Sequence, residues 1–378
     1  MKKQYVFLTL GILVCVAFYV YQSQTTVKSW PTKPLNVFVG WSSGGSSDVV
    51  TRAVCMGMEK ALGQKMLVTN VTGAQGSIAA AQVVKTKADG YHLFGGAAVH
   101  GTWPVMGQSD VSWTDFYAFL SVVFPTTIYV QQDAPWQTLE EFLTDIRNHP
   151  EGHFKVGHPG AGSNGSIFAH LVFRAAGLSG KVLPIPYKGG REAGRYLLSG
   201  EVQCACVTIG DLIDWAEAGR VRPLANLFNQ DIVIHDITFP AITHIYPELE
   251  PFQAINPHMG VYVRRDTAPE IVTRIAEAFM YAIQQQTFQR LALQERAGRL
   301  SCMVGRAADE KMSKIESARG WALFELGVAP RNPADFGIPE ISRWHWPPYE
   351  RAAGLKLWPD EVEKLYEEYT QTKNDVTE

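Results

Sequence analysis

The sequence predicts an α/β protein made of two lobes, because two separate stretches of the chain repeat one order of strand, small-residue turn, helix and strand. The stretches cover residues 35–94 and 154–209. Short apolar runs that alternate with helical patterns are typical of sheets with parallel strands. The chain has 378 residues, of which 46% are hydrophobic, so it can bury a sizeable core and form two or three domains.

The first unit begins with the apolar run Leu35–Val39, which we expect to be a buried strand. A helix should follow over 46–62, because capping residues precede an apolar residue at every fourth position, and Gly63 ends it. The residues concerned are the capping Ser46, Ser47 and Asp48 and the apolar Val50, Val54, Met58 and Leu62. The further expected elements are strands at 66–69 and 91–94, a turn at 70–76 and a helix at 77–85.

The second unit has the same order of elements. We expect strands at 154–157, 182–186 and 202–209, a helix at 166–176 and another that follows Gly190 and ends at Leu198, and then a returning strand at 259–263 and a helix from Pro269. Small-residue turns at 159–165 and 187–190 follow the first two of these strands. Ligands of open α/β sheets bind at the carboxyl ends of the strands. We therefore expect the turns of the two units to face each other across a ligand-binding cleft.

The first residues predict export from the cytoplasm. Lys2 and Lys3 precede the uncharged, apolar stretch 5–21, which is at the short limit for spanning a bilayer. This stretch is either a cleaved signal peptide or a retained anchor in the inner membrane, and the rest of the chain should lie in the periplasm. The expected domains are 1–30 as signal peptide or anchor, 31–130 with 245–328 as lobe 1, 131–244 as lobe 2, and 329–378 as a C-terminal extension.

Charge and residue spacing argue against several classes of function. The net charge is −3 and the chain has no basic run, so we expect no nucleic-acid partner. We also expect no metal and no cofactor, because scattered histidines lack i, i+4 pairing and the cysteines match no zinc pattern. The histidines considered are His92, His100, His158 and His170. Cys55 and Cys302 could form a disulfide in an oxidising compartment, although burial as small apolar residues is favoured.

Two glycine-rich segments match patterns of other functions. Gly40–Gly44 fits G-x-S-x-G with Ser42 as a hydrolytic nucleophile, but the predicted helix begins too late for the sharp turn that such a serine needs. Gly160–Gly165 fits G-x-G-x-x-G, but the region about 20 residues later lacks the acidic residue of a dinucleotide site.

Both segments are better interpreted as anion cradles at the beginning of helices. A helix N-terminus carries unpaired N–H groups and a partial positive charge, and small residues let an anion approach it closely. Hydroxyl and amide side chains of both units could then hold a carboxylate without an arginine. The candidates are Ser43, Ser46 and Ser47 in the first unit and Ser163 and Asn164 in the second. Asp48 would repel an anion, and we expect it to stabilise its own helix terminus.

Several segments between about Pro34 and Gly327 resemble, in order and spacing, the extracytoplasmic solute-binding proteins of tripartite tricarboxylate transporters, the Bug-type receptors. The segments are LNVFVGWSSGGSSD (35–48), NVTGAQG (70–76), ADGY (88–91), GAGS (160–163), PYKG (186–189) and AGRVRPLA (218–225). The resemblance implies a two-lobed periplasmic-binding-protein fold of type II, with a sheet flanked by helices in each lobe. It also implies a receptor, not an enzyme, that closes on a small carboxylate and delivers it to membrane permease subunits.

Carried over segment by segment, the resemblance implies ligand contacts from loops of both lobes and no catalytic residue. The expected contacts are Trp41, Ser43, Gly44, Gly45, Ser46, Ser47, Ala74, Gln75, Ala161, Ser163, Asn164, Tyr187, Lys188 and Thr208. Two positions depart from the family pattern. Gly40 and Trp41 replace the usual Pro-Phe, and the larger ring would narrow the pocket or stack on the ligand. Val207 and Thr208 stand where relatives often have an aspartate, which favours a ligand without an amino group.

The sequence thus predicts a monomeric receptor for a small carboxylate. Two other functions stay open. One is a serine hydrolase that uses Ser42. The other is a receptor-derived scaffold that binds protein partners through residues 329–378, a stretch that lies outside the family pattern.

Overall fold

The computed structural model describes residues 30–347 and 354–377. Apart from Trp30, the predicted signal peptide or anchor at 1–30, with its apolar stretch 5–21, lies outside the described residues. Within the described ranges, no helix combines the length and the apolar character that crossing a membrane requires.

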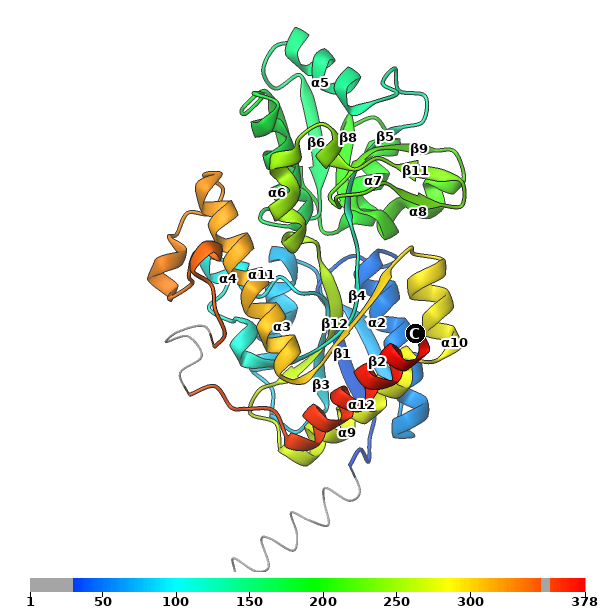
Figure 1. Ribbon diagram of the computed structural model, residues 1–378, viewed down its shortest axis with the longest axis vertical. Helices are drawn as coiled ribbons and strands as arrows, with labels where there is room; N and C mark the ends of the chain where they lie inside the picture. Colours follow the sequence, from blue (N-terminus) through cyan, green and yellow to red (C-terminus); the bar gives the residue numbers. More distant parts are fainter. Residues whose placement is uncertain (1–29, 348–353, 378) are drawn as a thin grey trace, which may run out of the picture.

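Two lobes are stacked along the longest axis of the molecule (Figure 1). Lobe 1 contains β1 (Leu35–Val39), α2 (Ser46–Leu62), β2 (Met66–Asn70), α3 (Ser77–Val84), β3 (His92–Ala97), α4 (Thr102–Val105), β4 (Phe116–Val123), β12 (His258–Arg264), α9 (Pro269–Ile283), α10 (Gln286–Phe288), β13 (Arg299–Met303) and α11 (Gly305–Glu325). Lobe 2 contains β5 (Thr126–Gln131), α5 (Leu139–Asn148), β6 (Phe154–His158), α6 (Asn164–Ala175), β7 (Val182–Pro186), α7 (Gly190–Leu198), β8 (Cys204–Thr208), α8 (Ile209–Glu217), β9 (Val221–Asn226), β10 (Ile232–Ile234) and β11 (Ile237–Phe239). A last helix, α12 (Asp360–Thr377), lies across α9 of lobe 1.

Each lobe is organised around one sheet, which confirms the predicted two-lobed α/β fold. The strand order is β13-β4-β12-β3-β1-β2 in lobe 1 and β7-β6-β8-β5-β9 in lobe 2. The sheets are not wholly parallel as the sequence pattern suggested. The strands β1, β2 and β3 are parallel, whereas β12 is antiparallel to both β3 and β4, and β5 is antiparallel to β8 and β9. The antiparallel strands are those next to the points where the chain passes between the lobes.

The helix predicted at 46–62 is confirmed as α2. Its apolar stripe of Val50, Val54 and Met58 is fully buried, as a spacing of four residues requires for one helical face. Gly63 ends the helix in the left-handed conformation, with φ of 68°. The helix packs closely on α9, because a Cβ atom at Gly57 would lie only 2.5 Å from the Cβ atom of Ala282.

Between β4 and β5 the chain crosses from lobe 1 to lobe 2 at 124–125, and before β12 it returns at 256–257. We call these two segments the hinge. They are bonded to each other. The amide of Phe124 donates to Pro257 O over 3.1 Å, and the amide of Thr126 donates to Asn256 Oδ1 over 2.9 Å. The crossings differ from the expected lobe boundaries at 130/131 and 244/245. Because β5 pairs with β8 and β9, it belongs to lobe 2, and residues 247–255 contribute Leu249 and Ile255 to the core of that lobe.

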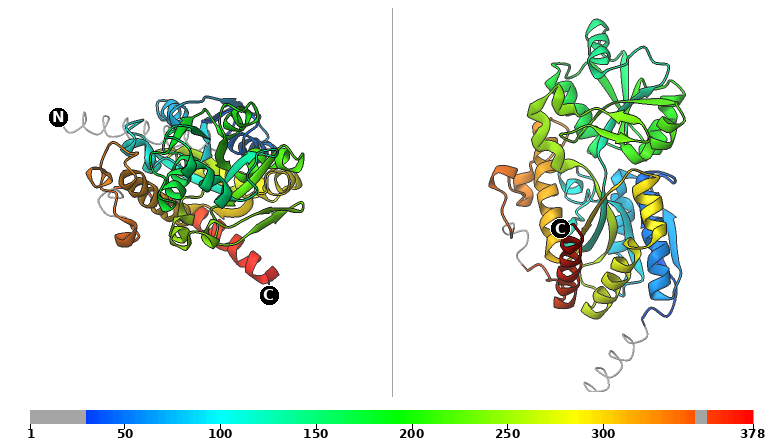
Figure 2. Two further views of the ribbon diagram at one scale, coloured as in Figure 1. Left: turned by 90° about the horizontal axis from the view of Figure 1, so that it is seen from above. Right: turned by 45° about the vertical axis from the view of Figure 1, so that its right-hand side comes forward.

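Helix α11 runs beside both lobes (Figures 1 and 2). Its N-terminal half contributes Met312 and Ile315 to the core of lobe 1, and its C-terminal half contributes Ala322 and Leu323 to the core of lobe 2. The extension that follows returns to lobe 1, where Trp358 is buried. The residues expected to form a separate C-terminal extension therefore pack against the body of the protein.

Strand β7 is an edge of the sheet in lobe 2, and it contains Pro184 and Pro186. The amide of Tyr187 donates inward to His158 O of β6 over 2.9 Å. Since successive residues of a strand point their N–H groups to alternate sides, the two prolines occupy positions whose N–H groups would point away from the sheet. They therefore cost the sheet no internal hydrogen bond.

The four described cysteines are buried and free. The disulfide considered between Cys55 and Cys302 is not formed. Cys302 Sγ lies 3.6 Å from Met280 Sδ, and burial raises the pKa of both thiols, to about 12 for Cys302. Both residues serve as small apolar groups of the core.

Candidate ligand-binding cleft

Loops at the carboxyl ends of strands in both lobes meet between the lobes, and they line an inner and an outer cavity. The inner cavity has a volume of about 20 Å³ and the outer cavity one of about 530 Å³. Of the fourteen predicted contacts, the inner cavity is lined by Trp41, Gly45, Ser46, Ser47, Asn164 and Thr208. The outer cavity is lined by Ala74, Gln75, Ala161, Tyr187 and Lys188. Ser43, Gly44 and Ser163 line neither of these two cavities.

The N-terminus of α2 lies at the centre of the inner cavity and contacts lobe 2 directly. Gly45 precedes the helix in an extended conformation, and Ser46 is the first helical residue. The amide of Ser46 donates to Asp211 Oδ1 over 2.8 Å, and the hydroxyls of Ser46 and Thr208 are 2.8 Å apart. The predicted cradle of lobe 1 is thus held against the beginning of α8.

The loop before α2 is tied to the acidic residue of its own helix. Asp48 Oδ2 accepts from the amide of Gly44 over 3.0 Å and from the hydroxyl of Ser43 at 3.4 Å. Asp48 Oδ1 accepts from Arg52 and Asn70, both over 2.9 Å. Asp48 therefore orders the loop and the helix terminus, as the sequence suggested. A ligand role for Ser43 and Gly44 stays a prediction.

Trp41 belongs to the core of lobe 1 and presents only part of its ring to the inner cavity. The side chain is 7% exposed and packs against Phe94, with ring centroids 6.1 Å apart. Two glycines make room for it, since a Cβ atom at Gly96 would lie 2.2 Å from the indole ring and one at Gly76 would lie 3.1 Å from it. A role for Trp41 in the choice of ligand stays a prediction.

The loop before α3 reaches across to lobe 2 in a strained conformation. Ala74 and Gln75 have φ of 41° and 52°, a region that residues other than glycine rarely adopt and that is common at functional sites. Gln75 is 5% exposed, its Nε2 donates to Ala161 O, and its Oε1 has no hydrogen-bond partner among the described residues. The loop therefore places an amide side chain on the wall of the outer cavity, in contact with lobe 2.

In lobe 2, the predicted contact residues Ser163 and Asn164 are held in place by hydrogen bonds to a helix terminus and to a neighbouring strand. The hydroxyl of Ser163 accepts from the amide of Ser166 over 3.1 Å and so caps α6. Asn164 Nδ2 donates to Thr126 Oγ1 over 2.9 Å. Burial lowers the pKa of His158, at the end of β6, to about 4, so this imidazole is neutral at pH 7.

Two tyrosines form the wall of the outer cavity. The rings of Tyr187 and Tyr196 stack with centroids 4.5 Å apart. Burial, and then the hydrogen bond to Glu201, raises the pKa of Tyr187 to about 12, so the hydroxyl is neutral at pH 7. The outer cavity therefore combines aromatic faces with the charged groups of Lys188 and Glu192.

Two residues at the junction of the lobes were missed by the sequence analysis. Asp211 was visible only as the last residue of a T-x-x-D capping box that begins at Thr208, and this pattern says nothing about a contact with the other lobe. Arg319 of α11 is fully buried and donates to Gly162 O and Ile255 O, both over 3.1 Å. No local pattern around Arg319 indicated that its side chain connects the hinge with the loop 160–163.

The geometry gives Ser42 no base. Its hydroxyl is buried without a hydrogen-bond partner among the described residues, whereas a serine nucleophile needs a base within hydrogen-bond reach.

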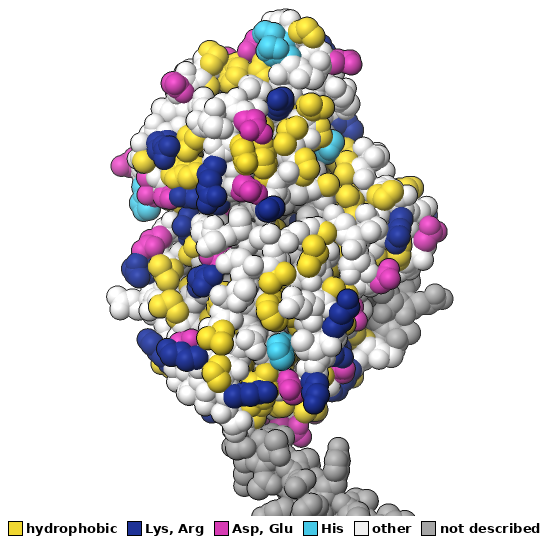
Figure 3. Space-filling view, turned by 180° about the vertical axis from the view of Figure 1, so that it is seen from behind, with side chains coloured by type: hydrophobic (Ala, Val, Ile, Leu, Met, Phe, Trp, Pro, Cys, Tyr) yellow, Lys and Arg dark blue, Asp and Glu magenta, His cyan; other side chains and the backbone are white. Residues whose placement is uncertain are grey.

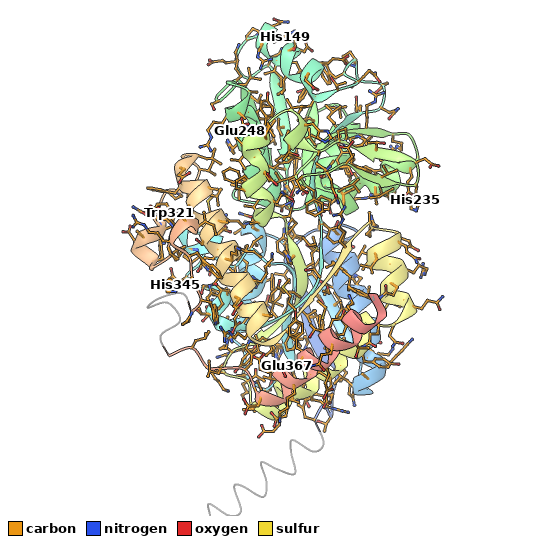
Figure 4. All side chains as sticks on the ribbon, in the orientation of Figure 1. His149, His235, Glu248, Trp321, His345 and Glu367 are labelled. Carbon is orange, nitrogen blue, oxygen red and sulfur yellow. The ribbon has the colours of Figure 1, made fainter. Side chains whose placement is uncertain are left out.

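Within the described ranges, no group of three metal-ligating side chains comes together. The labelled His149, His235 and His345 lie at separate places on the surface (Figure 4). Basic and acidic side chains are interspersed on the face shown in Figure 3.

Two sheet-based lobes, a double crossing between them and polar loops that meet across a cleft define the class of two-lobed solute-binding proteins. Within this class, the chain belongs to the tripartite tricarboxylate transporter family of receptors, whose sequence profile matches residues 50–298. This confirms the resemblance seen in the sequence. The family consists of receptors, and its members act outside the cytoplasm.

Individual relatives agree with this assignment. A UPF0065 protein of Agrobacterium vitis, from the TAR-I ttuE-ttuC' intergenic region, is 28% identical over 68% of this chain and 72% of its own length. A TctC solute-binding protein from Polaromonas has a similar structure, with a TM-score of 0.56 and 27% identity over 78% of this chain and 99% of the other. The Rpa4515 protein of R. palustris, solved with adipate, shares the fold, with a TM-score of 0.70 and 22% identity over 79% and 99% of the two chains.

Proposed function

We propose that this receptor captures a small carboxylate between its lobes and delivers it to the membrane subunits of a tripartite transporter. The observation that carries the proposal is the contact between Ser46 and Asp211, because there the N-terminus of α2 binds a carboxylate oxygen over 2.8 Å. The amide, the neighbouring hydroxyls and the helix dipole suit this group. The solved relative with adipate supports the same class of ligand.

The mechanism follows from the two-lobed architecture. A ligand carboxylate would bind the amide at the beginning of α2 after the lobes have separated, and the loops 160–163 and 187–188 of lobe 2 would then close over it without returning Asp211 to this amide. Closure is favoured because the ligand contacts both lobes only in the closed state. We expect the protein to act as a monomer in the periplasm, with residues 5–21 as its signal peptide or anchor.

A thermal-shift panel tests the proposal. Adipate, malate, citrate, benzoate and aspartate are added in turn, and adipamide serves as an uncharged control of the same length as adipate. A ligand at a hundred times its Kd stabilises the folded state by about 2.7 kcal/mol, so at least one acid should raise the Tm while adipamide does not. The proposal fails if no acid of the panel, and no acid that co-purifies with the protein, raises the Tm.

We infer that Ser42 has no catalytic role. Its hydroxyl lacks a partner among the described residues, and α2 begins four positions later, at Ser46. The scaffold alternative is likewise disfavoured, because the outer cavity of about 530 Å³ does not include Trp41 in its lining. A fluorophosphonate probe that labels the native protein but not a Ser42→Ala variant would overturn the first inference.

A further inference from the structure

Asp211 presents a carboxylate to the same amide that the proposed ligand would use. The residue is 5% exposed, and it accepts three hydrogen bonds. Two of them come from the amide and the hydroxyl of Thr208, over 3.1 and 2.7 Å, to Oδ2. These bonds lie within lobe 2 and fix the side chain as a cap of α8. The other oxygen, Oδ1, is thereby directed at the amide of Ser46 in lobe 1.

Glycines on both sides allow this close approach. A Cβ atom at Gly190, the first residue of α7, would lie 2.0 Å from Asp211 Oδ2, and one at Gly45 would lie 3.1 Å from Oδ1. The inner cavity beside these atoms has a volume of about 20 Å³, which is close to the minimum that holds one water molecule. A ligand carboxylate therefore cannot enter beside Asp211 while the lobes are in this position.

The charge of the site also admits only one carboxylate. The N-terminus of α2 offers a partial positive charge, which stabilises a single anion. Two guanidinium groups lie beside Asp211, and both already have partners. That of Arg191 donates to Asp211 O and to both carboxylate oxygens of Asp214, and that of Arg296 donates to Gly210 O over 3.0 Å. A second anion next to Asp211 would thus be repelled without a cation to compensate.

We propose that Asp211 is an internal competitor for the ligand, an inference that rests on the proposed function for the identity of the ligand. Its carboxylate binds the amide of Ser46 when the lobes close on each other, and a ligand carboxylate takes this amide only after the lobes have separated. The capping bonds keep Asp211 in place in lobe 2, so it is lobe separation and not a rotation of the side chain that exposes the amide.

The competition sets the affinity for the ligand. The apparent affinity equals the intrinsic affinity multiplied by the fraction of molecules that are open. A short monocarboxylate only replaces the hydrogen bond between the amide of Ser46 and Asp211 by an equivalent hydrogen bond. It therefore gains little binding free energy. A longer acid also gains contacts in the outer cavity, which adjoins the inner one because Pro159 lines both. Competition by Asp211 weakens the binding of both kinds of acid by the same factor, so an acid needs the additional contacts of the outer cavity to bind well.

An Asp211→Asn variant of the full chain tests the proposal, with Glu217→Gln as the matched control. Glu217 is a carboxylate of the same helix α8, but it pairs with His235 within lobe 2. Hydrogen exchange of the peptide that contains Ser46 reports opening, and calorimetric titration with adipate and acetate reports affinity. We expect Asp211→Asn to exchange several-fold faster and to bind both acids more tightly, by a similar several-fold factor. Glu217→Gln should match the native protein.

A second variant separates competition from general loosening. Ser46→Pro removes the shared amide at a helix position where proline is tolerated. It should exchange faster in the peptide that contains Asp211, and it should bind adipate more weakly than the native protein. The proposal is overturned if Asp211→Asn leaves exchange and affinity unchanged, or if it weakens adipate binding as Ser46→Pro does. If neither acid binds any variant while Asp211→Asn still speeds exchange, the contact between the lobes is upheld and the carboxylate-receptor proposal fails instead.

Discussion

At the scale of single residues, His100 couples the stability of lobe 1 to pH. Its ring is enclosed by the aromatic rings of Phe94, Trp103, Phe116 and Tyr262, with centroid distances of 4.4 to 5.4 Å. Neither ring nitrogen has a hydrogen-bond partner among the described residues. Burial lowers the pKa of His100 to about 3, against an ordinary value of 6.5. The folded protein therefore keeps this ring neutral in acid.

A His100→Phe variant should be less sensitive to acid than the native protein. Between pH 6.5 and about 3 the unfolded chain binds a proton at His100 and the folded chain does not, so the free energy of unfolding falls as the pH falls. One such group contributes about 1.4 kcal/mol per pH unit. Denaturant unfolding at pH 7 and pH 4.5 should show a shallower decline for His100→Phe. His153→Phe at an exposed position is the control, and parallel declines for His100→Phe and the native protein would refute the expectation.

The residues of the cleft show how far the sequence could predict the site. The loops were found because glycine and serine follow strands, and that signal is local. The contact between Ser46 and Asp211 joins residues 165 positions apart, and no local pattern reports it. The burial of Trp41 could not be predicted from local sequence either. It depends on Gly76 and Gly96, which make room for the indole ring only in the folded chain.

At the scale of elements, the segment after α11 completes the core of lobe 1. Trp358 packs against Tyr117 and Phe119 of β4, with ring centroids 4.7 and 5.3 Å apart. Its Nε1 donates over 2.9 Å to Asp309 Oδ2, and Asp309 forms a buried ion pair with Arg265 at 2.6 Å. The segment therefore covers a strand that would otherwise expose aromatic rings and a charged pair.

Removing this tryptophan side chain should be costly. We expect Trp358→Ala to lower the free energy of unfolding by about 3–5 kcal/mol, the usual cost of deleting a buried aromatic side chain. Trp344→Ala is the matched control from the same segment, since Trp344 is only half-buried and its Nε1 donates to Ser313. Chemical denaturation measures both values, and an equally small loss in the two variants would show that the segment is dispensable.

Elements were easier to predict than their assembly. The stripe of α2 fixed its length and its buried face, and Gly63 fixed its end. The expected boundaries between the lobes, at 130/131 and 244/245, were misplaced from the crossings at 124–125 and 256–257. The run 116–131 is mostly apolar on both sides of the first crossing, so its hydrophobicity does not mark the crossing. The docking of Trp358 could not be predicted, since its partners in β4 lie some 240 residues earlier in the chain.

At the scale of the whole molecule, Asn256 holds the two hinge segments together. It is buried, its Oδ1 accepts from the amide and hydroxyl of Thr126 over 2.9 and 3.1 Å, and its Nδ2 donates to Leu227 O over 2.7 Å. The side chain of this crossing residue thus bonds the first residue of β5 and the residue after β9. These bonds fasten the returning crossing to lobe 2.

An Asn256→Ala variant should be less stable and should have a looser hinge. It leaves an amide and a carbonyl without partners, each at a cost of about 1–3 kcal/mol, so we expect a total loss of about 2–4 kcal/mol. Hydrogen exchange at Thr126 should also become faster. Asn229→Ala, at an exposed position of lobe 2, is the control. Unchanged exchange at Thr126 would show that the hinge is held by other contacts.

The prolines of β7 have a consequence for how copies of the protein meet. An edge strand with free N–H and C=O groups is a template on which a strand of another molecule can assemble. Pro184 and Pro186 remove two of the outward donors from this edge without weakening the ladder to β6. Even in crowded solution, β7 is therefore a poor template for joining the sheets of two copies into a continuous aggregate.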